Sequence, residues 1–197
     1  MKKLILASAS PARRRTLVAA GIDPEIVVSG VDESTVDTAD PAELAGTLAE
    51  LKASAVAATI SQDLVLGCDS VLGFDGEVLG KPADAAEATK RWLAMRGRSG
   101  VLYTGHCLIE ADTGRRAGEV AWTKVYFSDI TDAEIRRYVE TGEPLNVAGA
   151  FTIDGIGGAF VERIEGDHGT VVGLSMPVLR RLLGELGVQL TDLWRAA

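Results

Sequence analysis

Two serines, Ser8 and Ser10, and three consecutive arginines are gathered in the stretch SASPARRR near the start of the chain. Ser10 followed by Pro11 predicts the beginning of a helix, with Ser10 as its N-cap residue. The exposed N–H groups of such a helix start already carry about half a positive charge, so guanidinium groups there are repelled. A bound phosphate would remove the repulsion, because free N–H groups and hydroxyls bind anions. The stretch predicts an anion site; the alternative is that the arginines extend into solvent.

One aspartate, Asp69, follows the apolar run Leu64–Cys68, which is typical of a strand buried on both faces. Open α/β sheets place their ligand chemistry where such strands end. A carboxylate there can accept a proton from water or hold a divalent cation. The alternative is that Asp69 caps the turn to Ser70. Asp32 and Glu33, in a loop after another predicted strand, could supply a second carboxylate or form a solvated acidic pair.

Motifs of several other enzyme classes are incomplete. The run GKP at residues 80–82 resembles the end of a P-loop but has proline where that motif needs Ser or Thr. The GIG run at 155–157 lacks the third spaced glycine of a dinucleotide fingerprint, and no GxSxG elbow is present. The two histidines, His106 and His168, give little material for a triad or a zinc site. A Walker-type ATPase is therefore disfavoured.

The composition favours a packed protein that does not bind a polyanion. The chain has 197 residues, 47% of them hydrophobic, and a net charge of -8, which argues against a nucleic-acid partner. Cys68 and Cys107 lack CxxC spacing, which indicates reduced thiols. The apolar run after Lys2 is too short for a signal peptide, and no stretch approaches the about 20 apolar residues of a membrane span. We expect a soluble cytoplasmic protein without a membrane partner.

The elements that must position these residues alternate between strands and helices. Helices are predicted from Pro11 to Ala20, after Asp40, from Asp84 through Trp92, after Thr131, and from Pro177 to Leu186. Strands are predicted at residues 4–6, 26–29, 64–68, 71–74, 77–79, 101–110, 117–127 and 159–164, with a loop at 165–169. Leu44, Leu48, Leu51 and Ala55 mark the apolar face of the second helix. The glycine-rich stretch AGAFTIDGIGGAF must turn tightly or approach something closely.

This alternation predicts an α/β fold, with a mixed β-sheet, flanking helices and two lobes around a cleft. An ordered series of motifs supports it: LILASASPARRRTL, VDE at 31–33, LGCDSVLGFDGEVLGKP, YTG at 103–105, YVETGEPLNVAGAFTIDGIGGAFVERIEGD and VVGLSMPVL. Together they resemble the Maf family of nucleotide pyrophosphatases over nearly the entire chain. The resemblance implies a single domain over 1–197, with a fold similar to inosine triphosphatases.

The activity implied by the resemblance is hydrolysis of a nucleoside triphosphate between its α and β phosphates. The products are a nucleoside monophosphate and pyrophosphate, and a divalent cation, Mg²⁺ or Mn²⁺, is required. By the same resemblance Asp69 is the proton acceptor, Asp69 and Glu33 are the candidate metal ligands, and the polyphosphate binders are Ser8, Arg13, Arg14, Glu33, Lys52 and Lys81.

The chain departs from the recognised Maf subgroups at three positions of the base pocket, which hold Ala12, Ser70 and Asp154. An acidic Asp154 could accept hydrogen bonds from N–H donors on a base, and Ala12 leaves room beside it. The alternative function implied by the resemblance is a nucleotide-binding regulator of cell division that inhibits septum formation through protein partners. The family resemblance is also compatible with a homodimer.

Overall fold

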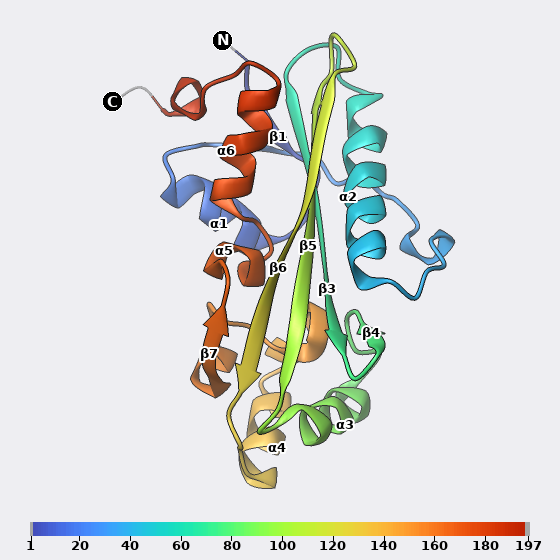
Figure 1. Cartoon of the computed structure of the whole chain (residues 1–197), viewed down its shortest axis with the longest axis vertical. Helices are drawn as coiled ribbons and strands as arrows, with labels where there is room; N and C mark the ends of the chain where they lie inside the picture. Colours follow the sequence, from blue (N-terminus) through green and yellow to red (C-terminus); the bar gives the residue numbers. More distant parts are fainter. Residues whose placement is uncertain (1, 196–197) are drawn as a thin grey trace.

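The computed structural model describes residues 2–195, which form a mixed seven-stranded sheet (Figure 1). The strands pair in the order β2-β1-β3-β5-β6-β7, and β4 pairs with β3. β1 is parallel to β2 and β3, whereas the other pairs are antiparallel. The strand bounds are β1 Leu4–Leu6, β2 Glu25–Ile26, β3 Leu64–Phe74, β4 Glu77–Leu79, β5 Ser99–Glu110, β6 Arg116–Phe127 and β7 Val161–Glu165.

Helices flank this sheet, which confirms the predicted α/β class (Figure 1). The α-helices are α1 Pro11–Ala19, α2 Pro41–Ala57, α3 Ala85–Met95, α4 Asp132–Glu140, α5 His168–Val172 and α6 Met176–Glu185. Short 3-10 helices are η1 Glu33–Thr35, η2 Glu143–Asn146, η3 Ala148–Ala150, η4 Ile156–Phe160 and η5 Leu190–Leu193. Helix α5 was not predicted: its first two residues lie in the predicted loop at 165–169, and its other three carried no prediction. Strand β2 is shorter than the predicted 26–29.

Two hydrophobic clusters lie along the long strands β3, β5 and β6 and correspond to the two predicted lobes. In one cluster α6 packs against the sheet near β1. In the other, α3 and α4 pack against the sheet near the opposite end of the molecule (Figure 1). Trp92 lies in the second cluster, with edge-on contacts to Phe127 and Tyr138 at ring-centroid distances of 5.6 Å. Because three strands cross both clusters, the region between the lobes is built on continuous sheet.

Helix α2 packs on the sheet through small residues, so the predicted apolar face is wrong except for Leu48. The buried residues of the helix are Ala45, Leu48, Ala49, Ala53 and Val56. A Cβ atom at Gly67 of β3 would lie 2.2 Å from the Ala49 carbonyl oxygen, and one at Gly105 of β5 would lie 2.1 Å from that of Ala45. Alanine opposite glycine lets helix and sheet backbones approach closely. A pattern based on large apolar residues misses such a contact.

Strand β3 runs without a break from Leu64 to Phe74, so the predicted strand end at Asp69 is wrong. Strand β5 pairs with β3 from Leu64 to Gly73, and this long antiparallel ladder carries Asp69 through as an ordinary strand residue. The sequence suggested a break because a carboxylate interrupts an apolar run. In the fold, the ladder with β5 overrides that local signal.

The predicted helix starts are confirmed by their capping bonds. Ser10, Asp40, Asp84 and Thr131 each accept a hydrogen bond from a backbone N–H of the first turn. The full reciprocal capping box forms at Thr131, whose N–H donates to Glu134.

The glycine-rich segment folds closely around the carboxylate of Glu143. That carboxylate accepts hydrogen bonds from Thr152 Oγ1 at 2.6 Å and from the backbone N–H groups of Ile156 and Gly157 at 2.9 Å. Burial alone would raise the pKa of Glu143, but these bonds outweigh it and lower the pKa. A Cβ atom at Gly155 would lie 2.5 Å from Glu143 Oε2. The expected close approach is therefore confirmed.

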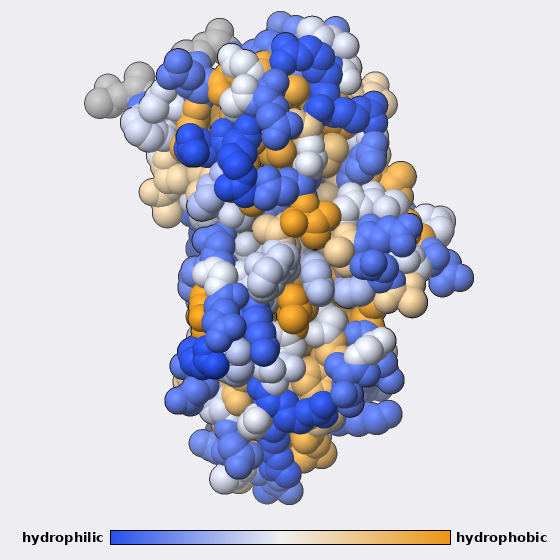
Figure 2. Space-filling view, viewed as in Figure 1, coloured by the Kyte–Doolittle hydropathy of each residue, from blue (hydrophilic) through white to orange (hydrophobic). Residues whose placement is uncertain are grey.

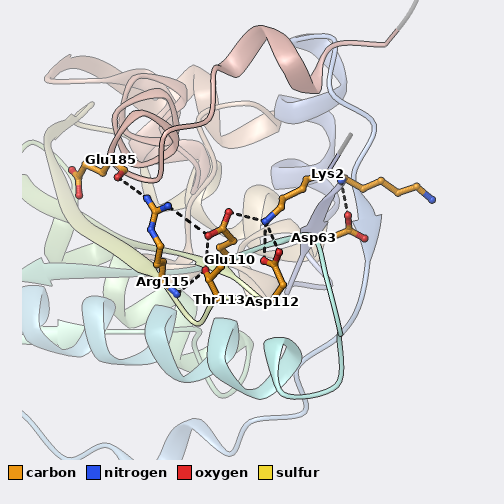
Figure 3. Close-up of polar contacts among 8 residues, drawn as sticks. Lys2, Asp63, Glu110, Asp112, Thr113, Arg115 and Glu185 are labelled. Carbon is orange, nitrogen blue, oxygen red and sulfur yellow. Dashed lines mark hydrogen bonds and ion pairs between the residues drawn. The ribbon is translucent and has the colours of Figure 1, made fainter.

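A cluster of charged residues ties the N-terminal strand to the turn between β5 and β6 (Figure 3). Lys2 Nζ donates to Glu110 at 2.7 Å and to Asp112 at 2.8 Å, while Thr113 Oγ1 also donates to Glu110. The Lys3 backbone N–H donates to Asp63 at 2.8 Å. Glu110 stands opposite Leu64, at the end of the β3–β5 ladder remote from Phe74. The cluster fastens this end of the fold and contains none of the predicted site residues.

The face of the molecule that Figure 2 shows is predominantly polar. Figure 2 shows mostly hydrophilic residues on the viewed face, with small separate apolar patches. The most exposed large apolar side chains belong to Val28, Trp122, Ile156 and Trp194. Within residues 2–195, every helix is too short or too polar to cross a bilayer.

Candidate functional site

Six of the predicted site residues gather at a gap in the sheet beside β3: Ser8, Arg13, Glu33, Lys52, Asp69 and Ser70. On the edge of β3 away from β5, strand β1 pairs with Leu64–Leu66 and strand β4 pairs with Leu72–Phe74. Within the described chain, residues 67–71 have no partner strand on that edge. The chain leaves β1 through the loop that carries Ser8, and it leaves β4 through Gly80–Pro82. Asp69 thus lies past the end of β1, although not at the end of its own strand.

On the α2 face of the sheet, Lys52 joins two carboxylates. Lys52 Nζ lies 2.5 Å from Asp69 Oδ1 and 2.6 Å from Glu33 Oε1. The side chains of Lys52 and Asp69 are each only 11% exposed, whereas that of Glu33 is 56% exposed. Helix α2, strand β3 and η1 therefore bring together three residues that are far apart in sequence, as the family resemblance implied.

The environment of Asp69 suits a proton acceptor. Burial raises the pKa of its carboxyl above the ordinary value, while the charges of Lys52 and Arg13 act in the opposite direction. A general base works best when its pKa is closer to the operating pH. The ammonium of Lys52 also fixes the orientation of the carboxylate in the gap.

The guanidinium of Arg13 is held by neutral partners only. Its Nε donates to the Gly173 carbonyl at 2.8 Å, Nη1 donates to Ser8 Oγ at 3.1 Å, and Nη2 donates to Ser70 Oγ at 3.2 Å. Among residues 2–195, no carboxylate lies within ion-pair distance of this guanidinium, although it is half-buried. Partial burial of a cation without a counter-ion costs free energy, and an anion that binds beside the cation offsets this cost. This supports the anion site predicted from SASPARRR.

Two residues help to position Arg13, and sequence reasoning missed both of them. Thr104 is fully buried; its Oγ1 donates to the Thr170 carbonyl at 2.7 Å and lies 2.9 Å from Ser70 Oγ. Gly173 has a φ of +107°, and a Cβ atom there would lie 3.2 Å from Arg13 Nε. Both residues belong to motifs that carried the resemblance, YTG and VVG, but neither motif indicated a role from sequence alone. Ser70, predicted for base recognition, accepts a hydrogen bond from Arg13 Nη2.

The other predicted site residues lie farther from these contacts. Arg14 is exposed, and its Nη2 is 3.9 Å from Asp23 Oδ1. Lys81 is exposed and, within residues 2–195, makes no ion pair. The Asp154 carboxylate pairs with Arg15 at 3.0 Å, so the third arginine of the stretch acts across to the glycine-rich segment. Ala12 lies in the first turn of α1 and is half-buried.

The residues present fit a divalent cation that is bound together with substrate. No cluster of three or more His, Cys, Asp or Glu residues that could hold a metal occurs in the described part of the chain. Mg²⁺ needs only one or two protein carboxylates when phosphate oxygens and water complete its shell. Asp69 and Glu33 offer two carboxylates close together, since both contact the Lys52 ammonium. The position of that ammonium shows where a positive charge is favoured.

Neither cysteine is suited to nucleophilic chemistry. Cys68 and Cys107 are buried free thiols, as predicted. Burial raises the pKa of Cys68 to about 12 and that of Cys107 to about 11. Since the thiolate is the nucleophile, both groups are inert near neutral pH.

His106 is a structural residue on the face that holds Arg13. Its Nε2 accepts the backbone N–H of Ser175 at 2.9 Å, and the residue is 2% exposed. Burial and the neighbouring Arg13 charge lower the pKa of His106 from 6.5 to about 4. His106 is therefore neutral in the folded protein at pH 7, as expected for an ordinary strand histidine.

The lowered pKa of His106 predicts a loss of stability in acid. Above pH 6.5 the residue is neutral in both states and contributes nothing to pH dependence. As the pH falls from 6.5 to 4, the unfolded state gains the proton first, so the free energy of unfolding falls by about 3 kcal/mol. The free energy of unfolding is measured with denaturant across this pH range for wild type and His106→Gln. This part of its pH dependence should appear only in wild type. Exposed His168→Gln is the matched control, and an equal slope in His106→Gln would refute the assignment.

At this open sheet edge, a buried carboxylate–lysine pair lies near an arginine that is held by neutral groups. This arrangement is expected of a polyphosphate-binding protein. Comparison with known sequences identifies the family: the one described as Maf-like protein matches residues 3–186. This chain therefore belongs to the Maf family, and the resemblance drawn from its motifs is confirmed.

Similar curated proteins carry the name nucleoside triphosphate pyrophosphatase. The protein of Salinispora tropica is 63% identical, with 98% of this chain and 87% of that protein covered. The protein of Streptomyces avermitilis is 58% identical over 98% of this chain and 95% of its own length. The protein of Nostoc punctiforme is 52% identical, with 97% of both chains covered.

Proposed function

We propose that this protein is a nucleoside triphosphate pyrophosphatase that releases a nucleoside monophosphate and pyrophosphate. One arrangement carries the proposal. At a single gap in the sheet, buried Asp69 is paired with Lys52, and the Arg13 guanidinium has no carboxylate within ion-pair distance among residues 2–195. Full-length similarity to proteins named for this activity supports it.

The reaction follows from the position of these groups. Asp69 accepts a proton from a water molecule as the water oxygen bonds to phosphorus and the anhydride P–O bond breaks. Lys52 and Arg13 stabilise the negative charge that builds up on the phosphate oxygens. Lys81, on the loop after β4, extends this positive charge along the polyphosphate, with Ser8 donating a hydrogen bond. No step requires a covalent intermediate on the protein.

Asp69 and Glu33 would hold the divalent cation, Mg²⁺ or Mn²⁺. When bound, the cation neutralises phosphate oxygens and lowers the barrier to attack on phosphorus. Lys52 contacts both carboxylates, so it orients them toward the same point.

The remaining expectations are part of the proposal. Residues 1–197 act as a single domain, since β3, β5 and β6 extend through both hydrophobic clusters. Two buried free thiols fit a reducing cytoplasm. The partner is the nucleotide rather than a nucleic acid, in line with the net charge of -8. A homodimer stays a prediction, which sedimentation of the purified chain tests.

A turnover screen tests the proposed function. The dialysed protein is supplied with Mg²⁺ or Mn²⁺ and a panel of common, methylated and deaminated nucleoside triphosphates, and both products are quantified. We expect equal amounts of monophosphate and pyrophosphate from at least one nucleotide. Nucleotide binding without turnover by any of them would refute the enzyme and favour the regulator of septum formation.

A further inference from the structure

Arg91, on helix α3, is a largely buried cation that no step of the proposed reaction uses. Its side chain is only 11% exposed, and within residues 2–195 its buried Nε has no hydrogen-bond partner. Burial of a guanidinium costs free energy, and an arginine on the surface of a helix ordinarily extends into solvent. Its ion pair with Glu87, one turn earlier on the same helix, adds little stability to the helix. The cost of burial therefore indicates a contact outside the helix that requires the guanidinium.

That contact is with the loop that carries Lys81, between β4 and α3. Arg91 Nη1 donates to the Gly80 carbonyl at 2.6 Å. Glu87 Oε2 accepts the backbone N–H of Ala83, also at 2.6 Å. One bond holds the residue immediately before the lysine, and the other holds the residue two positions after it. The backbone of the loop is therefore fixed on both sides of Lys81.

The Gly80 carbonyl accepts a second hydrogen bond, from the glycine-rich segment. The backbone N–H of Gly149 donates to it at 3.0 Å. Gly149 has a φ of +68°, and a Cβ atom there would lie 2.7 Å from a side chain of β3, so this turn requires glycine. Trp92, which is fully buried on α3, donates from Nε1 to the Ala150 carbonyl at 2.8 Å. Helix α3 thus holds the Lys81 loop and the turn at 149–150 against each other.

The two lysines of the proposed mechanism are held in different ways. The Lys52 ammonium is fixed directly, by its contacts with Asp69 and Glu33. The ammonium of exposed Lys81 lies at the end of a flexible four-carbon stem, so its position depends on where the loop places the backbone. A cation stabilises a transition state best when it is already in place as the charge develops. A fixed loop provides this preorganisation for Lys81.

We infer that Arg91 is a positioning residue for the reaction, because its guanidinium holds the Gly80 carbonyl and so directs Lys81 toward the phosphates. This inference rests on the proposed function and adds to it a residue that acts through Lys81 rather than on the substrate. Glu87 supports the same arrangement, since one carboxylate oxygen pairs with Arg91 and the other holds the loop at Ala83.

A double-mutant cycle separates this role from a role in folding alone. Values of kcat/KM, with the nucleoside triphosphate that wild type hydrolyses fastest, and dissociation constants for inorganic triphosphate are measured for wild type, Lys81→Ala, Arg91→Met and the double variant. Methionine keeps an unbranched stem but has no donor for the Gly80 carbonyl. We expect Arg91→Met to lower kcat/KM about ten-fold, because a stabilising charge is misplaced, and to have no effect once Lys81 is alanine. Triphosphate binding should follow the same pattern. Lys90→Met, an exposed neighbour on α3, is the matched control and should retain wild-type values.

Equal losses from Arg91→Met in both backgrounds would overturn the inference, because the residue would then act independently of Lys81. Wild-type values in either single variant would overturn it as well. If Arg91→Met does not fold, Arg91→Lys takes its place in the cycle: it keeps a charge beside Glu87 but loses the planar fork, so a smaller loss confined to the Lys81 background is expected. A wild type that hydrolyses no nucleotide, with the expected pattern in triphosphate binding, would refute the proposed activity while the positioning role stands.

Discussion

Replacing Asp69 by asparagine is expected to lower kcat by about 10³-fold, because an amide cannot accept the proton of the attacking water. The side chain keeps its size and its place in the gap, so nucleotide binding should persist. Steady-state kinetics and equilibrium binding of wild type and Asp69→Asn check this result. The substitution leaves the β3–β5 ladder intact, since only one side-chain oxygen changes.

The matched control is Asp112→Asn, which removes an exposed carboxylate in the Lys2 cluster at the far end of the sheet. This variant should retain wild-type kcat. An Asp69→Asn enzyme with wild-type kcat would show that the carboxylate neither accepts the proton nor assists a cation. Loss of nucleotide binding together with activity would place Asp69 in binding instead.

Replacing Arg13 by alanine is expected to lower kcat/KM by about 10²-fold or more, because a preorganised cation beside the phosphates is lost. Arg13→Lys should recover little of this activity. A lysine keeps the charge, but it cannot donate simultaneously to Gly173, Ser8 and Ser70. Kinetics of the three proteins at fixed ionic strength provide the measurement.

A suitable control is Arg116→Ala, which removes an exposed arginine paired with Glu50. Its kcat/KM should equal that of wild type. Full activity in Arg13→Lys would contradict the role of the three-way contact and reduce Arg13 to a point charge. Equal losses in Arg116→Ala and Arg13→Ala would indicate a general effect of net charge rather than a local anion site.

The fold was predictable wherever local chemistry decides the structure. Ser10 and Thr131 cap their helices as expected, because a side-chain oxygen before a helix has few better partners than the free N–H groups. The packing of α2 was not predictable in this way. It depends on glycines of β3 and β5 that become neighbours of the helix only in three dimensions.

The candidate site was predicted in part. The roles expected of Lys52, Glu33 and Asp69 came from the family resemblance, and the structure places the three side chains together. Thr104 and Gly173 could not be found from sequence, because their role consists of contacts with Arg13 and Ser70 across the fold. The break wrongly predicted at Asp69 arose because a carboxylate interrupts the apolar run, and sequence cannot show that β5 pairs with β3 through this position.

Hydrolysis in ¹⁸O-labelled water, with both products analysed by mass spectrometry, tests the central claim most directly. The account predicts one ¹⁸O atom per turnover, found in either the nucleoside monophosphate or the pyrophosphate, with no labelled inorganic phosphate. Release of a nucleoside diphosphate with labelled inorganic phosphate would contradict it, because water would then have cleaved the bond between the β and γ phosphates.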